Sequence, residues 1–119
     1  MANKVLIIDA DPRNIFALKA TLKSKGYECL SAQDAMEGIR MLQLQNDIGI
    51  VLIDMMMPDM DGYEAIPALK QTRQVPVLAV TAQAMMGDRE KCLAAGADEY
   101  VSKPIDVDRL LAIMKDKAK

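Results

Sequence analysis

The strongest constraint on the fold is the alternation of short apolar runs with longer amphipathic segments along the whole chain. The apolar runs are continuous and β-branched, which is typical of strands buried on both faces of a parallel sheet. Five such strands are expected, over Lys4 to Ile8, Tyr27 to Ser31, Ile48 to Ile53, Val75 to Val80 and Glu99 to Ser102.

Helices are expected between and after these strands, over Arg13 to Lys25, Asp34 to Leu44, Tyr63 to Gln71, Met85 to Ala95 and Val107 to Lys117. Pro67 interrupts the helix expected from Tyr63, and it is tolerated there only if the helix starts late enough to place it in the first turn. Strands that alternate with helices over short connections predict an α/β fold, a doubly wound five-stranded parallel sheet with helices on both faces. The 119 residues fit one domain, spanning residues 1–119.

Composition and charge exclude several classes of protein. Apolar residues make up 51% of the chain and charged residues 27%, a balance typical of a folded protein. The net charge is −2, so no basic surplus favours direct binding of nucleic acid. The longest uncharged stretch, Gln74 to Gly87, is too short and too interrupted to cross a membrane, and no signal-peptide core is present. A cytoplasmic protein is therefore expected.

The chain has no histidine, which excludes histidine-based triads, histidine metal sites and histidine phosphorylation of this chain. Its two cysteines, Cys29 and Cys92, form no CxxC pair and are interpreted as structural thiols. The run Met55 to Met57, with Met60, is interpreted as core packing and backbone geometry in preference to a soft-metal site.

Polar side chains fall at four of the five strand ends, where ligands of parallel α/β sheets bind. The first strand leads to Asp9 and Asp11, the third to Asp54, the fourth to Thr81 and the fifth to Lys103. Converging carboxylates repel unless a cation lies between them, and hard oxygen ligands favour Mg²⁺. A cation with an ammonium and a hydroxyl opposite it forms a pocket for a phosphoryl group, whose natural acceptor is the central carboxylate, Asp54.

Each of these residues also has a simpler interpretation when taken alone. Asp11 before Pro12 fits a helix N-cap, Thr81 a β-branched strand end and Lys103 a solvated charge. Only the occurrence of all these polar residues together, at one edge of the sheet, favours a functional site.

Several motifs at matching spacing cover essentially the whole chain. They are Val5 to Asn14, Val51 to Gly62 with Tyr63 and Glu64 after it, Ala79 to Ala82, Ala94 to Tyr100, and Lys103-Pro104. In these motifs the chain resembles the response-regulator receiver domains of two-component signalling, and the stretch from Met86 to Gly96 resembles receivers of hybrid histidine kinases. The resemblance implies a flavodoxin-like sheet with strand order 2-1-3-4-5.

The resemblance also implies a role for each matching residue. Asp54 resembles the phosphoacceptor, and Asp9, Asp54 and the backbone carbonyl of Met56 match the Mg²⁺ ligands. Thr81 and Lys103 match the groups that bind the phosphoryl oxygens. Tyr100 matches an aromatic switch residue that turns inward when Thr81 moves toward the phosphate, and Pro104 is expected to follow a cis peptide bond.

One position departs from the family pattern. The acidic residue that usually follows the first aspartate is replaced by Ala10, and Asp11 matches a variable position. Losing a carboxylate removes a ligand and a negative charge, so weaker Mg²⁺ binding is expected.

Three functions remain open from the sequence. The leading hypothesis is a phosphoacceptor switch and not an enzyme: a partner histidine kinase or histidine phosphotransfer protein donates to Asp54, and a downstream protein docks on the fourth helix, fifth strand and fifth helix. A receiver that has lost efficient phosphorylation would instead serve as a fixed docking module, and Ala10 is its support. Asp9 and Asp11 after a strand also resemble the nucleophile motif of haloacid-dehalogenase-type phosphatases, but that interpretation leaves Asp54 unexplained.

Overall fold

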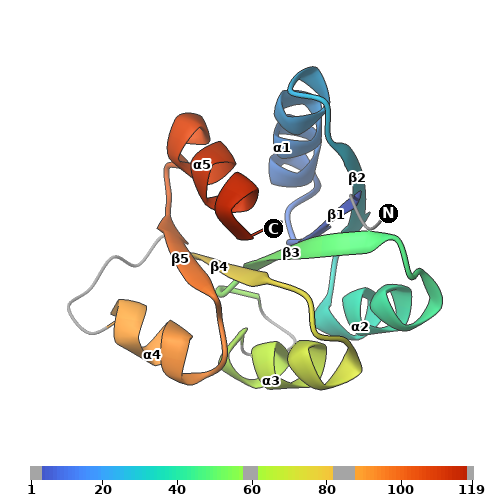
Figure 1. Cartoon of the computed structure of the whole chain (residues 1–119), viewed down its shortest axis with the longest axis vertical. Helices are drawn as coiled ribbons and strands as arrows, with labels where there is room; N and C mark the ends of the chain where they lie inside the picture. Colours follow the sequence, from blue (N-terminus) through green and yellow to red (C-terminus); the bar gives the residue numbers. More distant parts are fainter. Residues whose placement is uncertain (1–3, 58–61, 82–87, 118–119) are drawn as a thin grey trace.

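The computed structural model describes residues 4–57, 62–81 and 88–117, which form a central sheet between two layers of helices (Figure 1). The strands are β1 (Lys4–Ile8), β2 (Glu28–Ala32), β3 (Ile48–Asp54), β4 (Val77–Thr81) and β5 (Glu99–Ser102). The helices are α1 (Pro12–Ser24), α2 (Ala35–Leu44), α3 (Gly62–Thr72), α4 (Asp88–Ala94) and α5 (Val107–Lys117). No helix in this described part has the length and apolarity that a membrane crossing needs.

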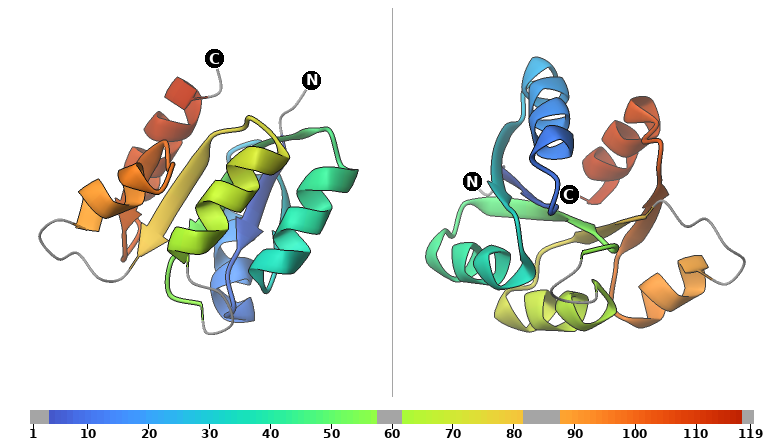
Figure 2. Two further views of the ribbon diagram at one scale, coloured as in Figure 1. Left: turned by 90° about the horizontal axis from the view of Figure 1, so that it is seen from below. Right: turned by 180° about the vertical axis from the view of Figure 1, so that it is seen from behind.

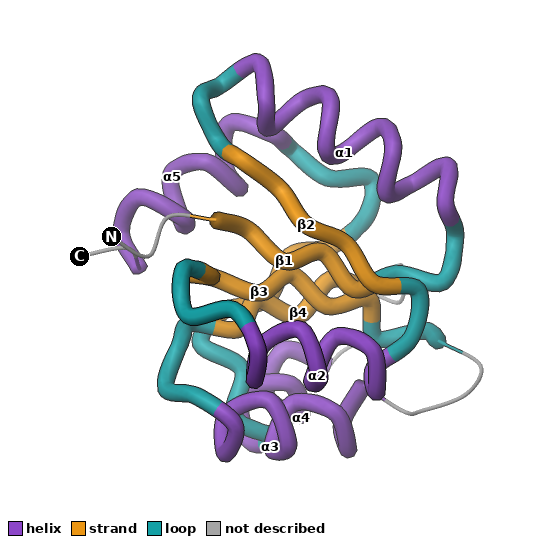
Figure 3. Tube along the Cα trace, turned by 90° about the vertical axis from the view of Figure 1, so that its right-hand side faces the viewer, coloured by secondary structure: helices purple, strands orange, loops and turns teal. Residues whose placement is uncertain are grey.

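The sheet has the order β2-β1-β3-β4-β5, and every neighbouring pair is parallel. Helices α1 and α5 cover one face, and α2, α3 and α4 cover the other (Figures 1 and 2). The predicted doubly wound α/β fold and its strand order are therefore confirmed. The start of β1 and the end of α5 lie at the same edge of the sheet, its amino edge (Figure 3). The opposite, carboxyl edge is where ligands of such sheets bind.

Most element boundaries lie within one residue of the predictions, and two differences involve proline residues. β4 begins at Val77 and not at Val75, because Pro76 has no N–H to donate and enters the ladder only through its carbonyl, which accepts from Val51 N–H. α3 begins at Gly62, one residue before the predicted start, so the exposed Pro67 lies inside the helix and not in its first turn, as its tolerance there would have required. The predicted start of α4 at Met85 lies outside the described residues.

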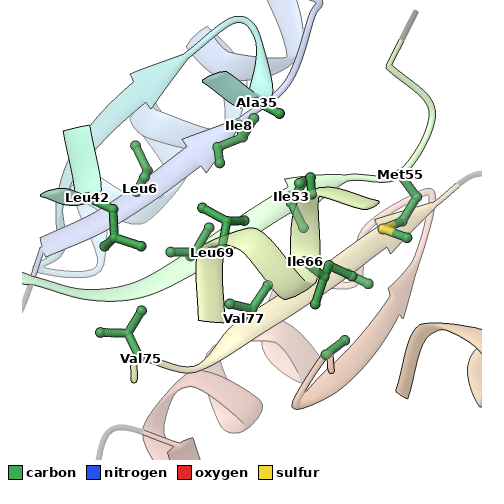
Figure 4. Packing of buried hydrophobic residues seen from close by; sticks show 14 of the residues in the cluster. Leu6, Ile8, Ala35, Leu42, Ile53, Met55, Ile66, Leu69, Val75 and Val77 are labelled. Atoms are coloured by element: carbon green, nitrogen blue, oxygen red, sulfur yellow. The ribbon is translucent and has the colours of Figure 1, made fainter. Parts of the chain in front are cut away.

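The core consists of two layers, one on each face of the sheet. On the face of α2 and α3, the side chains of Leu6, Ile53, Ile66 and Leu69 are fully buried (Figure 4). The other layer packs the opposite side chains of the same strands against the buried sides of α1 and α5. Burial on both faces explains why β1, β3 and β4 read as continuous apolar runs.

α2 crosses β1 so closely that only glycine fits at the contact. A Cβ atom added to Gly38 would overlap Cδ1 of Ile8 and would lie 2.8 Å from its Cγ1. This contact fixes the separation of α2 from the strand that leads to Asp9.

Oppositely charged groups are paired at the amino edge. Lys4 Nζ lies 2.7 Å from Asp47 and 3.2 Å from Glu28. Lys70 Nζ lies 2.8 Å from Asp98 Oδ2, which also accepts a hydrogen bond from the backbone N–H at the start of β4. These pairs join loops to the beginnings of strands.

Candidate functional site

The polar residues expected at the strand ends meet at the carboxyl edge of the sheet. Asp54 and Thr81 are the last residues of the adjacent strands β3 and β4. Asp9 directly follows β1, and Lys103 directly follows β5. The backbone N–H of Lys103 donates to the carbonyl of Thr81 over 2.8 Å, which continues the pairing of β4 and β5 up to the site.

The Lys103 ammonium faces both carboxylates. Its Nζ lies 3.6 Å from Oδ2 of Asp54 and 3.9 Å from Oδ2 of Asp9. Asp9 and Asp54 are both buried, with 7% and 8% of their surface exposed. One ammonium therefore opposes two buried carboxylates, which leaves the ionised site with an excess of negative charge.

Backbone groups orient the two carboxylates. Oδ1 of Asp9 accepts the N–H of Asp11 over 2.9 Å, and Oδ1 of Asp54 accepts the N–H of Met56 over 3.0 Å. In both residues the other oxygen, Oδ2, is the one nearest Lys103. The second contact also holds the Met56 backbone beside Asp54.

Burial raises the pKa of Asp9 above its ordinary value of 3.8, and the neighbouring Asp54 carboxylate raises it further. The N–H of Asp11 and the charge of Lys103 act in the opposite direction. Because these influences together raise the pKa of Asp9, the negative charge of this carboxylate is incompletely balanced by its surroundings. A divalent cation between the two carboxylates would supply the missing charge, and carboxylate oxygens are suitable ligands for Mg²⁺.

Asp11 does not replace the missing acidic neighbour of Asp9. Its carboxylate accepts the N–H of Arg13 over 2.9 Å and caps α1, as its simpler interpretation predicted. The Arg13 guanidinium, 3.3 Å away, lowers the pKa of Asp11. The part of the chain that the structure describes contains no group of three acidic or thiol side chains placed to hold a metal. Within the described ranges, Ala10 thus leaves Asp9 and Asp54 as the two carboxylates of the site.

The proposed switch residues are both buried. Thr81 is 2% exposed and Tyr100 is 8% exposed, within the core layer that faces α4. The sequence interpretation expected an outward ring that turns inward on activation, whereas the ring is inward in this structure. The peptide bond between Lys103 and Pro104 is cis, as the resemblance implied.

The methionine run packs as predicted for two of its members. Met55 and Met57 are buried in the core, whereas the Met56 side chain is 52% exposed. Met60 lies outside the described residues. The ion pair of Arg13 with Asp11 was not predicted, although a basic residue two positions after a helix-capping acid was the available signal.

Comparison with known proteins decides the family. The family model of the response regulator receiver domain matches residues 5–115. The chain belongs to the receiver domain family. It is 38% identical over 107 residues to the sensor histidine kinase RcsC of Salmonella typhi, covering 89% of this receiver and 11% of that protein. It is 36% identical over 110 residues to the transcriptional regulatory protein CpxR of Escherichia coli, covering 92% of this receiver and 47% of that protein.

A solved structure extends the likeness to the fold. The receiver domain of the sensor histidine kinase PA1611 from Pseudomonas aeruginosa superposes with a TM-score of 0.87 at 31% identity, covering 99% of this receiver and 98% of that chain. That crystal structure has a magnesium ion coordinated in its active site cleft.

The family gives this receiver its general role. It is a receiver domain of two-component signalling, a signalling domain rather than a catalytic enzyme. Receiver domains generally bind Mg²⁺ in the active site and interact with histidine kinases or phosphotransfer proteins. These findings favour neither the fixed docking module nor the phosphatase. The receiver spans about a tenth of RcsC and about half of CpxR.

Proposed function

We propose that this receiver is a phosphoacceptor switch in which Asp54 accepts a phosphoryl group from a partner's phosphohistidine. The observation that carries the proposal is the contact of one ammonium, Lys103 Nζ, with both buried carboxylates, 3.6 Å from Asp54 and 3.9 Å from Asp9. A positively charged group beside the acceptor carboxylate can also reach the oxygens of an incoming phosphoryl group.

Transfer forms a bond between a carboxylate oxygen of Asp54 and phosphorus, while the bond between phosphorus and the partner's imidazole nitrogen breaks. The Met56 N–H fixes the orientation of the attacking carboxylate. Lys103 and the Thr81 hydroxyl bind phosphoryl oxygens and offset their charge. Most of the rate therefore comes from positioning and electrostatics, because the protein has little covalent chemistry to perform.

The proposed Mg²⁺ ligands are Asp9, Asp54 and the backbone carbonyl of Met56. Bound there, the ion supplies positive charge against the carboxylates and the phosphoryl oxygens. The raised pKa of Asp9 supports this assignment, because an uncompensated buried carboxylate gains most from a nearby cation. With Ala10 in place of a second acid and Asp11 engaged as a helix cap, the affinity is weaker than three carboxylates would give.

Residues 1–119 are proposed to act as one receiver domain in the cytoplasm. The phosphodonor is a histidine kinase or a histidine phosphotransfer protein. The output surface is α4, β5 and α5, reached through Thr81 and Tyr100, the latter lying on β5 beside Ala79 of β4.

The test is labelling with a small phosphodonor and Mg²⁺, read by intact mass and followed by peptide mapping. The wild type should gain the mass of one phosphoryl group, and Asp54→Asn should gain none. Asp34→Asn is the matched control, because asparagine caps a helix as well as the aspartate that caps α2. Equal labelling of Asp54→Asn and the wild type would refute the assignment.

A further inference from the structure

The methionines that directly follow β3 differ in their exposure to solvent. Met55 and Met57 are buried, with 6% and 7% of their surface exposed, whereas Met56 between them is 52% exposed. An oxidant dissolved in water reacts with a thioether whose sulfur it can reach, so exposure selects Met56 within this run. The proposed function uses the backbone of Met56 and gives its side chain no role.

The backbone of Met56 is fixed beside the proposed phosphoacceptor. Its N–H donates to Oδ1 of Asp54 over 3.0 Å, and its carbonyl is a proposed Mg²⁺ ligand. The side chain leaves the same Cα atom that carries this carbonyl, so it starts beside the proposed metal ligands. A change in the chemistry of the Met56 side chain therefore takes place next to the metal site and the acceptor.

The proposed metal site lacks an oxygen that oxidation of Met56 would supply. Ala10 contributes no side-chain oxygen, and the Asp11 carboxylate is engaged by the N–H of Arg13 over 2.9 Å. A thioether sulfur is a soft ligand that Mg²⁺ does not favour, whereas a sulfoxide carries a hard oxygen that accepts strong hydrogen bonds. The sulfoxide is neutral, so it adds this oxygen without adding negative charge to the site.

We propose that Met56 is a methionine-oxidation site through which a peroxide raises the Mg²⁺ affinity of this receiver. The thioether sulfur attacks one oxygen of hydrogen peroxide, so that an S–O bond forms and the O–O bond breaks. The sulfur gives up an electron pair, and the departing hydroxide takes the proton from the transferred oxygen and becomes water. The sulfoxide oxygen then binds the ion or a water molecule of its hydration shell, and enzymatic reduction of the sulfoxide reverses the effect. The inference rests on the proposed function, since it concerns the proposed Mg²⁺ site.

The first measurement locates the oxidation in the chain. The receiver is treated with hydrogen peroxide, briefly incubated with a thiol that returns reversibly oxidised cysteines, and digested for peptide mapping by mass. Met56 and Met36, which is 56% exposed on α2, should gain oxygen, whereas Met55 and Met57 should stay reduced while the protein is folded. Faster oxidation of Met55 or Met57 than of Met56 would overturn the assignment.

The second measurement compares the Mg²⁺ affinity of treated and untreated protein by titration calorimetry. Oxidation should raise the affinity of the wild type by about tenfold, an effect typical of groups that orient metal ligands. Met36→Leu should respond to peroxide as the wild type does, whereas Met56→Leu should show no response, because leucine has a similar volume and no sulfur. Met56→Gln carries a neutral amide oxygen and should bind Mg²⁺ more tightly than Met56→Leu without peroxide. Unchanged affinity in the oxidised wild type, or a response that persists in Met56→Leu, would overturn the proposal.

The untreated wild type separates this inference from the proposed function on which it rests. If the untreated protein binds no Mg²⁺ in the same titration, the proposed metal site fails, and the inference fails with it. If it binds Mg²⁺ and a small phosphodonor labels Asp54, while oxidation leaves the affinity unchanged, only the role of the Met56 side chain is lost.

Discussion

Replacing Lys103 by glutamine tests the electrostatics of the site most directly. The change leaves Asp9 and Asp54 buried without the ammonium that contacts both. Two unit charges about 4 Å apart interact by about 1 kcal/mol in water and about 4 kcal/mol at an effective dielectric constant of about 20. The Lys103 side chain is 26% exposed, so the lower part of this range applies to each of its two contacts. Without metal we expect the free energy of unfolding to fall by about 2 kcal/mol.

The loss should depend on pH in a defined direction. The pKa of Asp9 is raised in the folded protein above its ordinary value of 3.8. The stability that comes from its neutral form is therefore fully present below about pH 3.8, and it is lost as the pH rises through the pKa that Asp9 has in the folded protein. Removing Lys103 removes an influence that lowers this pKa, which therefore rises further. The difference between variant and wild type should shrink from pH 7 toward pH 4, because Asp9 in its protonated form no longer needs the ammonium.

The assay is urea unfolding at pH 7 and at pH 5, with and without Mg²⁺. Saturating Mg²⁺ at pH 7 should also reduce the difference, because the ion replaces the lost positive charge. Lys91→Gln, at an exposed site on α4, is the control and should match the wild type throughout. A loss in Lys103→Gln that is the same at both pH values and unaffected by Mg²⁺ would refute the reasoning.

Three further predictions concern the metal, the packing and the proposed relay. Ala10→Asp should raise Mg²⁺ affinity on the order of tenfold, measured by titration calorimetry, and should lower the stability of the protein without metal. Equal affinity in both proteins would mean that Asp11 or water already acts as the missing ligand. Gly38→Ala should lower the free energy of unfolding by about 1–3 kcal/mol in denaturant titrations, because its Cβ would meet Ile8, and no loss would contradict the close packing of α2. Binding of a phosphoryl mimic should shift NMR signals around Tyr100, and these shifts should shrink in Thr81→Ala; shifts that stay local to the site in the wild type would exclude the relay.

The strand ends were predictable because the apolar runs carry a strong signal and end at polar residues. Asp54 closes such a run, and parallel topology then brings it to the same edge as Asp9 and Lys103. The tolerance of Pro67 inside α3 has a local cause. Helix propensity disfavours proline beyond the first turn, but tertiary packing of the buried Ile66 and Leu69 holds α3 together around it.

Other features depend on side-chain direction, which spacing along the chain does not fix. Asp11 could have faced the metal site or capped α1, and only its hydrogen bond to the Arg13 N–H decides between them. Phe16 stands beside Ile15 in the sequence, yet Ile15 is buried and Phe16 is 76% exposed, because neighbouring residues of a helix point to different sides. The inward ring of Tyr100 likewise follows from packing and not from its position on a strand.

The pairing of charges at the amino edge has a consequence for how this chain can vary. Glu28, Asp47 and Asp98 each have a nearby lysine there, so replacing one of these acids removes a favourable contact. Among the described residues of the site, the two carboxylates of Asp9 and Asp54 face one ammonium, so a neutral residue in place of either acid relieves repulsion. Replacing an acid by a neutral residue thus stabilises the folded protein at the site and destabilises it at the opposite edge. Folding alone would tolerate a neutral residue such as Ala10, whereas only selection for activity would retain Asp9 and Asp54.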